Sequence, residues 1–408
     1  MNIGIVGGSI SGCSAAQLLL AAGHEVQVFE RSDKPLSGRG GGIGTTSALF
    51  EEITEKGLIG SGFSSFQISS MPFIGRSDQS EPFGRLAWSL PMDFKVFQWN
   101  ELYENLRSNV ADTNYHKGTE IVNARLCSDH RVELTTDQGK TMQFDLVLFA
   151  DGYHSNGRRI LFPEKELKYR GYVLWRGLLE ETQMDNKVSL DNKILRLHYK
   201  EKPGHLVMYY IPGLAGDKDI GNRIFNWAAY VPVPMEELRD LMVGADGRER
   251  FGTLPPGQIK QEDENRLKGF LSSQIPGYYA EVVNRTKNSY IQVIYTLDLD
   301  HYSKDNMCLI GDAGMVIQPF TGSGVFKGYN NVKDLIDCLG SNSNIEEALL
   351  VWSRRQLKTG KRLLALGEQM EKAFIWEPPD FSEIDESKVS DWWARSVTFP
   401  DNFNFQNH

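Results

Sequence analysis

The feature that most constrains the fold of this sequence is a glycine-rich turn close to its start. An apolar run over residues 2–6 leads directly into Gly-Gly-Ser-Ile-Ser-Gly at 7–12. A helical pattern follows over 13–22, and Gly23 can take the left-handed conformation past the helix end. Residues 25–30 then alternate as a strand does. This order of strand, tight turn, helix and strand predicts a parallel βαβ unit.

The turn resembles the G-x-G-x-x-G pattern of dinucleotide-binding proteins, with Gly7, Ser9 and Gly12 at its three fixed positions. The first glycine makes the bend, the second lets the backbone approach a pyrophosphate, and the third packs helix against strand. Ser9 departs from the pattern but is small. Glu30 stands where a carboxylate accepts hydrogen bonds from a ribose diol. The turn therefore predicts a dinucleotide site, and leaves NAD and FAD both open.

Later segments extend this organisation. Residues 144–150 and 307–310 are apolar runs that end at glycine-containing turns, as expected for further strands of one sheet whose carboxyl ends face a ligand. Between them, residues 171–284 contain hairpin-like stretches, which predict an inserted and mostly antiparallel sheet. Residues 346–374 carry a long helical period that Pro378 and its neighbouring proline end.

Composition excludes several function classes. The chain has 408 residues with 44 basic and 53 acidic side chains, and this net charge of -9 argues against nucleic acid or an anionic membrane as partner. No run of about 18 apolar residues or signal sequence is visible, so we expect a cytoplasmic protein without a membrane span. The four cysteines form no C-x-x-C pair and no H-E-x-x-H occurs, so we expect no metal site.

Two further motifs give a resemblance. Asp-Gly-Tyr-His-Ser-Asn-Gly-Arg at 151–158 matches D-G-x-x-S-x-x-R, and residues 311–324 contain G-D-A followed by P-x-x-G-x-G. In this order after the first turn, they resemble the single-component FAD-dependent aromatic hydroxylases, the p-hydroxybenzoate hydroxylase class. Within that class, the first turn and residues 35–38 and 169–177 look most like the dihydroxypyridine hydroxylases.

The resemblance implies a reaction and its co-substrates. FAD would be the cofactor and NADH or NADPH the reductant, and O2 would be activated as a C4a-hydroperoxyflavin to hydroxylate a small aromatic or N-heteroaromatic compound such as a phenol or hydroxypyridine. The partners would be small molecules, and the protein a monomer or homodimer. Two alternatives stay open: oxidation of a larger natural product or antibiotic by hydroxylation, epoxidation or Baeyer-Villiger chemistry, and a non-catalytic flavin-binding protein.

The fold class implied is α/β. It comprises a Rossmann-like FAD-binding domain with a parallel sheet and βαβ start, an inserted substrate domain with a mostly antiparallel sheet, and a long C-terminal helix. The FAD-binding domain would be discontinuous. Its expected ranges are 1–70, 98–168 and 285–345, those of the substrate domain are 71–97 and 169–284, and the C-terminal helix and tail occupy 346–408.

Carried over position by position, the resemblance also implies FAD contacts. Asp312 would face the ribityl chain, although it could instead cap a helix. Asp151 and Arg158 would couple the pyrophosphate region to the nicotinamide, or form a plain salt bridge. Residues 40–44 resemble the loop beside which the flavin ring moves, or are a flexible surface loop. The expected cofactor-binding residues are Gly7, Ser9, Gly12, Glu30, Arg31, Arg39, Gly42, Gln98, Asp151, Arg158, Asp312, Pro319, Gly322 and Gly324.

A hydroxylated ring reacts faster when its hydroxyl group is deprotonated, so a base is expected near the substrate. His198 and Tyr210 are the candidate catalytic residues, since a histidine has a suitable pKa and both lie in the inserted sheet. Arg176 could pair with an anionic substrate or form an ordinary salt bridge. Other candidates in the same sheet are Tyr199, His205, Tyr209 and Tyr230.

Overall fold

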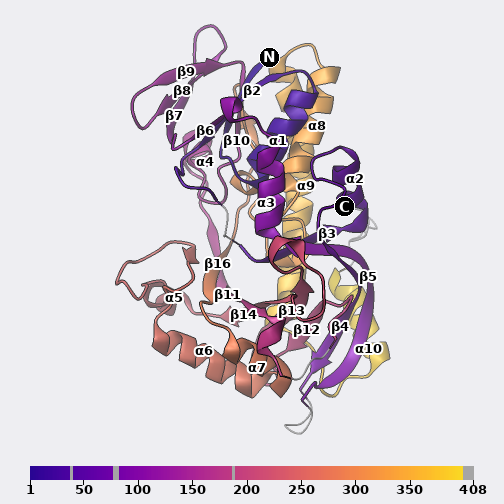
Figure 1. Cartoon of the computed structure of the whole chain (residues 1–408). Helices are drawn as coiled ribbons and strands as arrows, with labels where there is room; N and C mark the ends of the chain where they lie inside the picture. The colour runs from indigo at the N-terminus through magenta and orange to yellow at the C-terminus, as the bar shows by residue number, and fades with distance from the viewer. Residues whose placement is uncertain (37–39, 77–81, 186–188, 398–408) are drawn as a thin grey trace.

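The computed structural model describes residues 1–36, 40–76, 82–185 and 189–397 (Figure 1). Two large sheets organise these residues, and the long helix α9, Ile345–Glu371, connects them. Near the start of this helix, the carbonyl oxygen of Leu349 accepts a hydrogen bond from Ser303 in the first sheet. At its end, Glu371 accepts a hydrogen bond from Arg170 in the second sheet. No helix of the described ranges has the length and apolar character needed to cross a bilayer.

The first sheet has six strands and is parallel except at its β17–β18 edge. Helix α1, Ile10–Ala21, connects its two central neighbours β1 and β2, which confirms the expected βαβ unit. The carboxyl ends of β1, β2, β10 and β18 meet at one edge, where ligands bind in such sheets. In spatial order the strands are β17 Ser303–Lys304, β18 Met307–Leu309, β10 Leu146–Phe149, β1 Asn2–Val6, β2 Glu25–Glu30 and β6 Tyr115–Lys117.

Helices and a small sheet surround this parallel sheet (Figure 1). Helix α1 packs against α3 and α8, and α4 packs against the small sheet. The bounds are α2 Ser47–Glu55, α3 Trp99–Ser108, α4 Asn156–Leu161 and α8 Lys327–Ser341 for the helices, and β7 Ile121–Leu126, β8 Val132–Thr136 and β9 Thr141–Phe144 for the small antiparallel sheet.

The second sheet has nine strands, and each neighbouring pair is antiparallel except β12 and β4. This confirms the mostly antiparallel sheet expected for the inserted segment. In spatial order the strands are β15 Thr253–Leu254, β16 Tyr290–Thr296, β11 Lys168–Glu180, β14 Ile224–Pro232, β13 His205–Ile211, β12 Leu195–His198, β4 Phe66–Gly75, β5 Arg85–Gln98 and β3 Gly42–Thr46.

Three helices of the inserted segment were not predicted: α5 Met235–Leu241, α6 Gln261–Gln274 and α7 Gly277–Arg285. Leu267 and Leu271 of α6 are buried, and Leu267 lines a hollow together with Trp175 of β11 and Val231 of β14, so this helix lies against one face of the second sheet. The spacing of four residues between those two leucines is typical of a helix, and the interpretation of residues 171–284 as hairpins did not use it.

The C-terminal part covers the opposite side of the second sheet. After α9 and a π-helical turn at Lys372–Trp376, helix α10 spans Glu386–Val397. Trp392 and Trp393 pack edge-on against Phe73 of β4, so helix α10 packs on its own chain.

The two sheets do not follow the expected domain boundaries. Strand β4 crosses the proposed boundary at residue 71, and β3 pairs with β5 in the second sheet. The division therefore stays a proposal.

Candidate functional site

The first turn is built so that only glycine fits at two of its positions. Gly7 has a φ of 104°, and a Cβ there would lie 2.5 Å from the carbonyl oxygen of Ala150. A Cβ on Gly12 would lie 1.8 Å from the carbonyl oxygen of Gly7. These contacts hold the start of α1 tightly against the ends of β1 and β10, and Gly12 itself packs inside the helix without reaching a cavity.

The N-terminus of α1 offers free donors. Ser9 precedes the helix as its N-cap residue, yet its side chain accepts no capping hydrogen bond, and the first turn contains no acidic residue. The backbone N–H groups of a first helical turn have no partner within the helix. Together with the helix dipole they form a site for an anion such as a pyrophosphate.

Glu30 lies at the end of β2 and holds the first turn in place through hydrogen bonds. Its carboxylate accepts a hydrogen bond from the N–H of Gly8 and another from the N–H of Ser32, both at 2.9 Å. A carboxylate has about four acceptor sites, so sites remain for the hydroxyl groups of a ribose. The side chain is 8% exposed.

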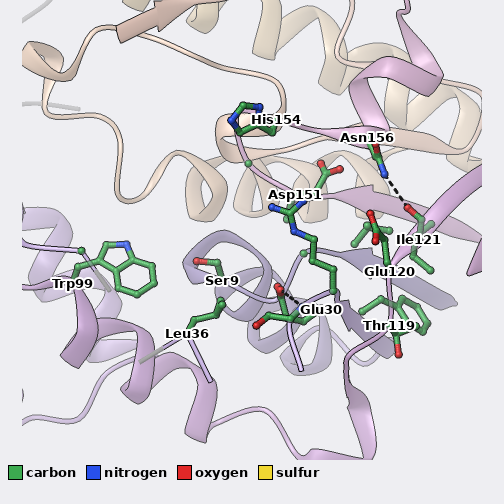
Figure 2. Close-up of a pocket in the computed structure, with 18 residues that line it drawn as sticks. Ser9, Glu30, Leu36, Trp99, Thr119, Glu120, Ile121, Asp151, His154 and Asn156 are labelled. Carbon is green, nitrogen blue, oxygen red and sulfur yellow. Dashed lines mark hydrogen bonds between the residues drawn. The ribbon is translucent and has the colours of Figure 1, made fainter. Parts of the chain in front are cut away.

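These groups line a first cavity of about 450 Å³, here called the dinucleotide cavity (Figure 2). Figure 2 shows Glu30 and Asp151 near its centre, with Trp99 at one side. Asp151 accepts a hydrogen bond from the N–H of Gly157, its other oxygen is buried without a partner among the described residues, and burial raises the pKa of its carboxyl group. Of the predicted cofactor residues, Gly7, Ser9, Glu30, Arg31 and Asp151 line this cavity.

A second cavity of about 440 Å³, here called the sheet cavity, lies between the second sheet and the segment 317–325. Gly322 in that segment has a φ of 64°, which favours glycine. Four residues line both cavities, so the two meet beside the N-terminus of α1: Ser9, Trp99, Ala150 and Gly152. Six predicted cofactor residues line the sheet cavity: Ser9, Gly42, Asp312, Pro319, Gly322 and Gly324.

Three predicted cofactor residues line neither cavity, namely Gly12, Gln98 and Arg158. The amide of Gln98 donates to the carbonyl oxygens of Pro212 and Gly213, at 2.6 and 2.8 Å. The guanidinium of Arg158 is buried and donates to the carbonyl oxygens of Ala313 and Tyr153. Both side chains are occupied in fixing loops, so the expectation that they contact the cofactor does not fit their positions. Arg39 lies outside the described residues.

Asp312 is paired with a residue that the sequence analysis did not single out. The ammonium group of Lys327 lies 2.5 Å from an Asp312 carboxylate oxygen, and it also donates to the carbonyl oxygen of Met315. Asp312 lies inside a short 3-10 turn, Gly311–Ala313, whose N-cap residue is Ile310, so Asp312 is not the N-cap residue of this turn. Lys327 is 6% exposed and lines the sheet cavity, which adds a buried cation to this wall.

The structure corrects the predicted catalytic residues. The His198 ring lies behind the sheet cavity, stacked on Phe381 at 3.9 Å, and neither ring nitrogen has a partner among the described residues. Burial, followed by the charge of Arg196, holds its pKa well below the ordinary value. Tyr210 points to the opposite face of the sheet and donates to Glu181. Neither side chain lines the cavity, so neither is placed to act on a substrate there.

The residues that do line the sheet cavity follow the register of four neighbouring strands. Arg176 of β11 pairs with Ala228 of β14, which pairs with Val207 of β13, which pairs with Arg196 of β12. Side chains opposite one another in a sheet share a face. The floor of the cavity is therefore apolar in the middle and cationic at both ends, and Tyr209 and Tyr230 also line it.

Arg176 connects this floor to the glycine-rich segment. Its guanidinium donates to the carbonyl oxygen of Gly42 at 2.9 Å, while the N–H of Gly42 donates to the Asn226 side chain at 2.7 Å. Gly42 also begins β3, which pairs with β5. Residues 42–44 are thus part of an ordered strand that is bonded to the cavity floor, which contradicts the alternative of a flexible surface loop for this part.

These cavities fit FAD. The free helix N-terminus suits a pyrophosphate, the Glu30 carboxylate suits a ribose, and the glycines at positions 7 and 322 allow close approach of a ligand to the backbone. The dinucleotide cavity and the sheet cavity adjoin, as the two ends of a long flavin dinucleotide require.

Comparison with known proteins agrees with this geometry. Residues 2–58 match the family described as pyridine nucleotide-disulphide oxidoreductase, and residues 169–296 match the family described as FAD binding domain-like. The chain is 27% identical over 371 residues to 2,6-dihydroxypyridine 3-monooxygenase of Paenarthrobacter nicotinovorans, with 89% of each chain covered. It is 23% identical over 388 residues to aurachin C monooxygenase/isomerase of Stigmatella aurantiaca, covering 92% of this chain and 90% of the relative.

The solved structure of 2,6-dihydroxypyridine-3-hydroxylase from Arthrobacter nicotinovorans superposes with a TM-score of 0.81 at 26% identity, and covers 94% of this chain and 96% of that one. The resemblance seen in the three sequence motifs thus extends along nearly the whole fold. The chain resembles the FAD-dependent aromatic hydroxylases along nearly its whole length, and it is an FAD-dependent monooxygenase.

Proposed function

We propose that the protein uses NADH or NADPH and O2 to hydroxylate a small phenol-like or hydroxypyridine-like ring. One ring C–H becomes C–OH, and the second oxygen atom leaves as water, for which the nicotinamide supplies a hydride and the solvent a proton. The observation that carries this proposal is the sheet cavity, in which an apolar floor with tyrosines and arginines faces the segment 317–325 expected to lie along the flavin.

Bound FAD would supply hydride acceptance and oxygen activation, because amino-acid side chains alone cannot do this chemistry. The chain contributes binding and orientation. The turn at Gly7 and Ser9 and the N-terminus of α1 would hold the pyrophosphate, and Glu30 the adenosine ribose. Asp312, with its charge partner Lys327, would face the ribityl chain.

The floor of the sheet cavity supports an aromatic substrate of modest size. Met71, Ile194, Val207 and Ala228 present apolar surface. A volume of about 440 Å³ is near the lower end for small-molecule sites, and the flavin ring must share it. One relative is named for 2,6-dihydroxypyridine, which supports a single-ring substrate. The aurachin-related enzyme is the reason to test larger compounds as well.

Tyr209 and Tyr230 line the sheet cavity, so they take the place of His198 and Tyr210 as proposed substrate contacts. Burial raises the pKa of both hydroxyl groups, that of Tyr230 to about 12. Both tyrosines are therefore protonated near neutral pH. We assign them the role of hydrogen-bond donors to substrate oxygens, which is the opposite of the base expected from the sequence.

The experiment is anaerobic reduction of the FAD-loaded protein by NADH and by NADPH, followed at the flavin absorption band. Hydroxypyridines, phenols and purines are added in turn. The proposal expects one ring class to accelerate reduction strongly. Equal, slow reduction with every ring would contradict the small-aromatic assignment and favour a larger substrate.

A further inference from the structure

Trp99 is the one aromatic side chain, among the described residues, that lines both the dinucleotide cavity and the sheet cavity. It is the first residue of α3 and is half-buried. Figure 2 shows its indole extending toward Ser9 at one side of the dinucleotide cavity. None of the proposed contacts to FAD or to the substrate uses this ring, so a large aromatic surface between two ligand cavities has no role yet.

Three contacts hold the indole in one orientation. The backbone N–H of Trp99 donates to the carbonyl oxygen of Gly41 at 3.0 Å. The Tyr103 ring, one helical turn further along α3, stacks against the indole with 5.5 Å between ring centres and 14° between ring planes. Gly40 lies against the other end of the side chain, where a Cβ would come within 2.8 Å of the Trp99 Cβ and Cγ atoms. The indole is therefore fixed, and residue 40 has no side chain to cover it.

The surroundings of Trp99 leave room for a second ring. The two cavities share only three other residues among those described, Ser9, Ala150 and Gly152, and all three are small and uncharged. In the proposed arrangement, the flavin ring lies along residues 317–325 and the substrate lies on the apolar floor of the sheet cavity. The nicotinamide must reach the flavin without displacing the substrate, and the junction beside Trp99 offers this approach.

Hydride transfer changes the charge of the nicotinamide ring. The dihydronicotinamide loses a hydride from its C4 atom to FAD, so the neutral ring becomes a pyridinium ring with one positive charge and FAD becomes its reduced anion. A cation over the face of an aromatic ring is attracted by the ring quadrupole, and tryptophan is the strongest such partner. The donating face of the nicotinamide must turn toward the flavin, which leaves its opposite face for an indole.

An indole in contact with the nicotinamide would act on the rate of this step. Only an interaction that is stronger in the transition state than in the ground state accelerates a reaction. The attraction between indole and nicotinamide grows as the hydride leaves, because positive charge then develops on the nicotinamide. No charged side chain of the described residues is common to both cavities, so none at the junction opposes this charge.

We infer that Trp99 is a catalytic residue of flavin reduction, whose indole stacks on the nicotinamide ring of NADH or NADPH and stabilises the positive charge that develops there. This inference rests on the proposed function, and it gives the co-substrate a binding surface on this chain. The chemistry recognised is a planar nitrogen-containing ring that becomes a cation.

The first measurement is equilibrium binding to the FAD-loaded protein by calorimetry, with three probes that share one adenosine diphosphate ribose part. NAD+ carries a cationic ring, tetrahydro-NADH carries a neutral ring that donates no hydride, and ADP-ribose carries no ring. The corresponding NADP series is measured in the same way. We expect the cationic probe of at least one series to bind about 10-fold or more tightly than its neutral and ringless partners.

Variants then assign this preference to Trp99. Trp99→Leu should bring the cationic and neutral probes within about 2-fold of each other and leave the affinity for ADP-ribose unchanged. Trp99→Phe should keep part of the preference, because a phenylalanine ring attracts a cation less strongly. Trp376→Leu removes a half-exposed tryptophan that lines neither cavity, so this matched control should leave all three affinities unchanged.

The second measurement is the limiting rate of anaerobic flavin reduction at saturating NADH or NADPH. Trp99→Leu should lower this rate about 10-fold or more, while the Kd for tetrahydro-NADH changes by less than about 3-fold and the FAD content stays that of the wild type. A merely structural role would instead lower the FAD content and weaken the binding of ADP-ribose together with the other probes.

A wild type that binds neither NAD+ nor NADP+ more tightly than the neutral-ring partner overturns the inference, even if no Trp99 variant folds. A folded, FAD-loaded Trp99→Leu variant that keeps the full preference or the full rate of reduction also overturns it. Neither measurement involves an aromatic substrate or O2. Confirmed stacking on Trp99 without any hydroxylation would therefore contradict the proposed function and leave this inference standing.

Discussion

Replacing Glu30 by alanine tests how the chain holds the dinucleotide. In the protein, the carboxylate accepts two backbone hydrogen bonds at 2.9 Å, from Gly8 in the first turn and from Ser32 after β2. A hydrogen bond to a charged group contributes about 1.5–3 kcal/mol. Alanine leaves room for water at both N–H groups, and water replaces part of both bonds, so we expect the free energy of unfolding to fall by about 2 kcal/mol, less than the sum of two such bonds.

The effect on the cofactor is expected to be larger. Losing two ribose bonds to the carboxylate, at about 1.5 kcal/mol each, corresponds to a Kd for FAD raised about 100-fold. The Kd of Glu30→Gln for FAD should lie between those of the wild type and Glu30→Ala. Glutamine keeps one oxygen as an acceptor, but its NH2 group is a donor and faces a backbone N–H that also donates. Glu25→Ala, at the exposed start of the same strand, is the control.

The assay is titration of FAD into the apoprotein, followed by quenching of flavin fluorescence, with urea unfolding measured in parallel. If Glu30→Ala binds FAD within about 3-fold of the wild type, while Glu25→Ala behaves identically, the assignment of Glu30 to the ribose is wrong.

Three further predictions follow from the packing. Gly12→Ala should abolish FAD binding or folding, because its Cβ would lie 1.8 Å from a backbone oxygen; an apoprotein that binds FAD normally would refute this. Glu371→Ala should cost about 3 kcal/mol in urea unfolding, since it strands Arg170 and the buried amide of Gln318, while Glu368→Ala, at the exposed partner of the same arginine, should cost little. Because the pKa of buried His198 is lowered, the unfolded chain takes up a proton at a higher pH than the folded protein does. The contribution of His198 to the free energy of unfolding is therefore complete above about pH 6.5 and is reduced by about 1.4 kcal/mol at pH 5.5. His198→Phe should remove that part of the pH dependence, and an unchanged slope would contradict it.

The sequence predicts local elements well, such as the strand, turn and helix of the first βαβ unit. Gly7, Gly12 and Glu30 lie within one βαβ unit, where the spacing along the chain is nearly the spacing in space. The segment 317–325 was recognisable for the same reason, because its glycines and proline define a short turn.

The parts that the sequence could not predict depend on packing between distant segments. Residues 205–211 are almost all buried, since helices cover one face of β13 and the cavity and tail the other, so no alternation shows that Tyr209 faces the cavity and Tyr210 does not. His198 shares a face with Arg196, but Phe381 from the tail covers it. Only the assembled sheet shows that Arg196 lines the cavity.

The measurement that tests the central claim most directly is turnover under 18O2 with the ring compound that most accelerates flavin reduction. The account predicts one 18O atom in each hydroxylated product and one NADH or NADPH consumed for each product formed. Consumption of the nicotinamide with hydrogen peroxide as the sole product, for every ring compound that accelerates reduction, would contradict it.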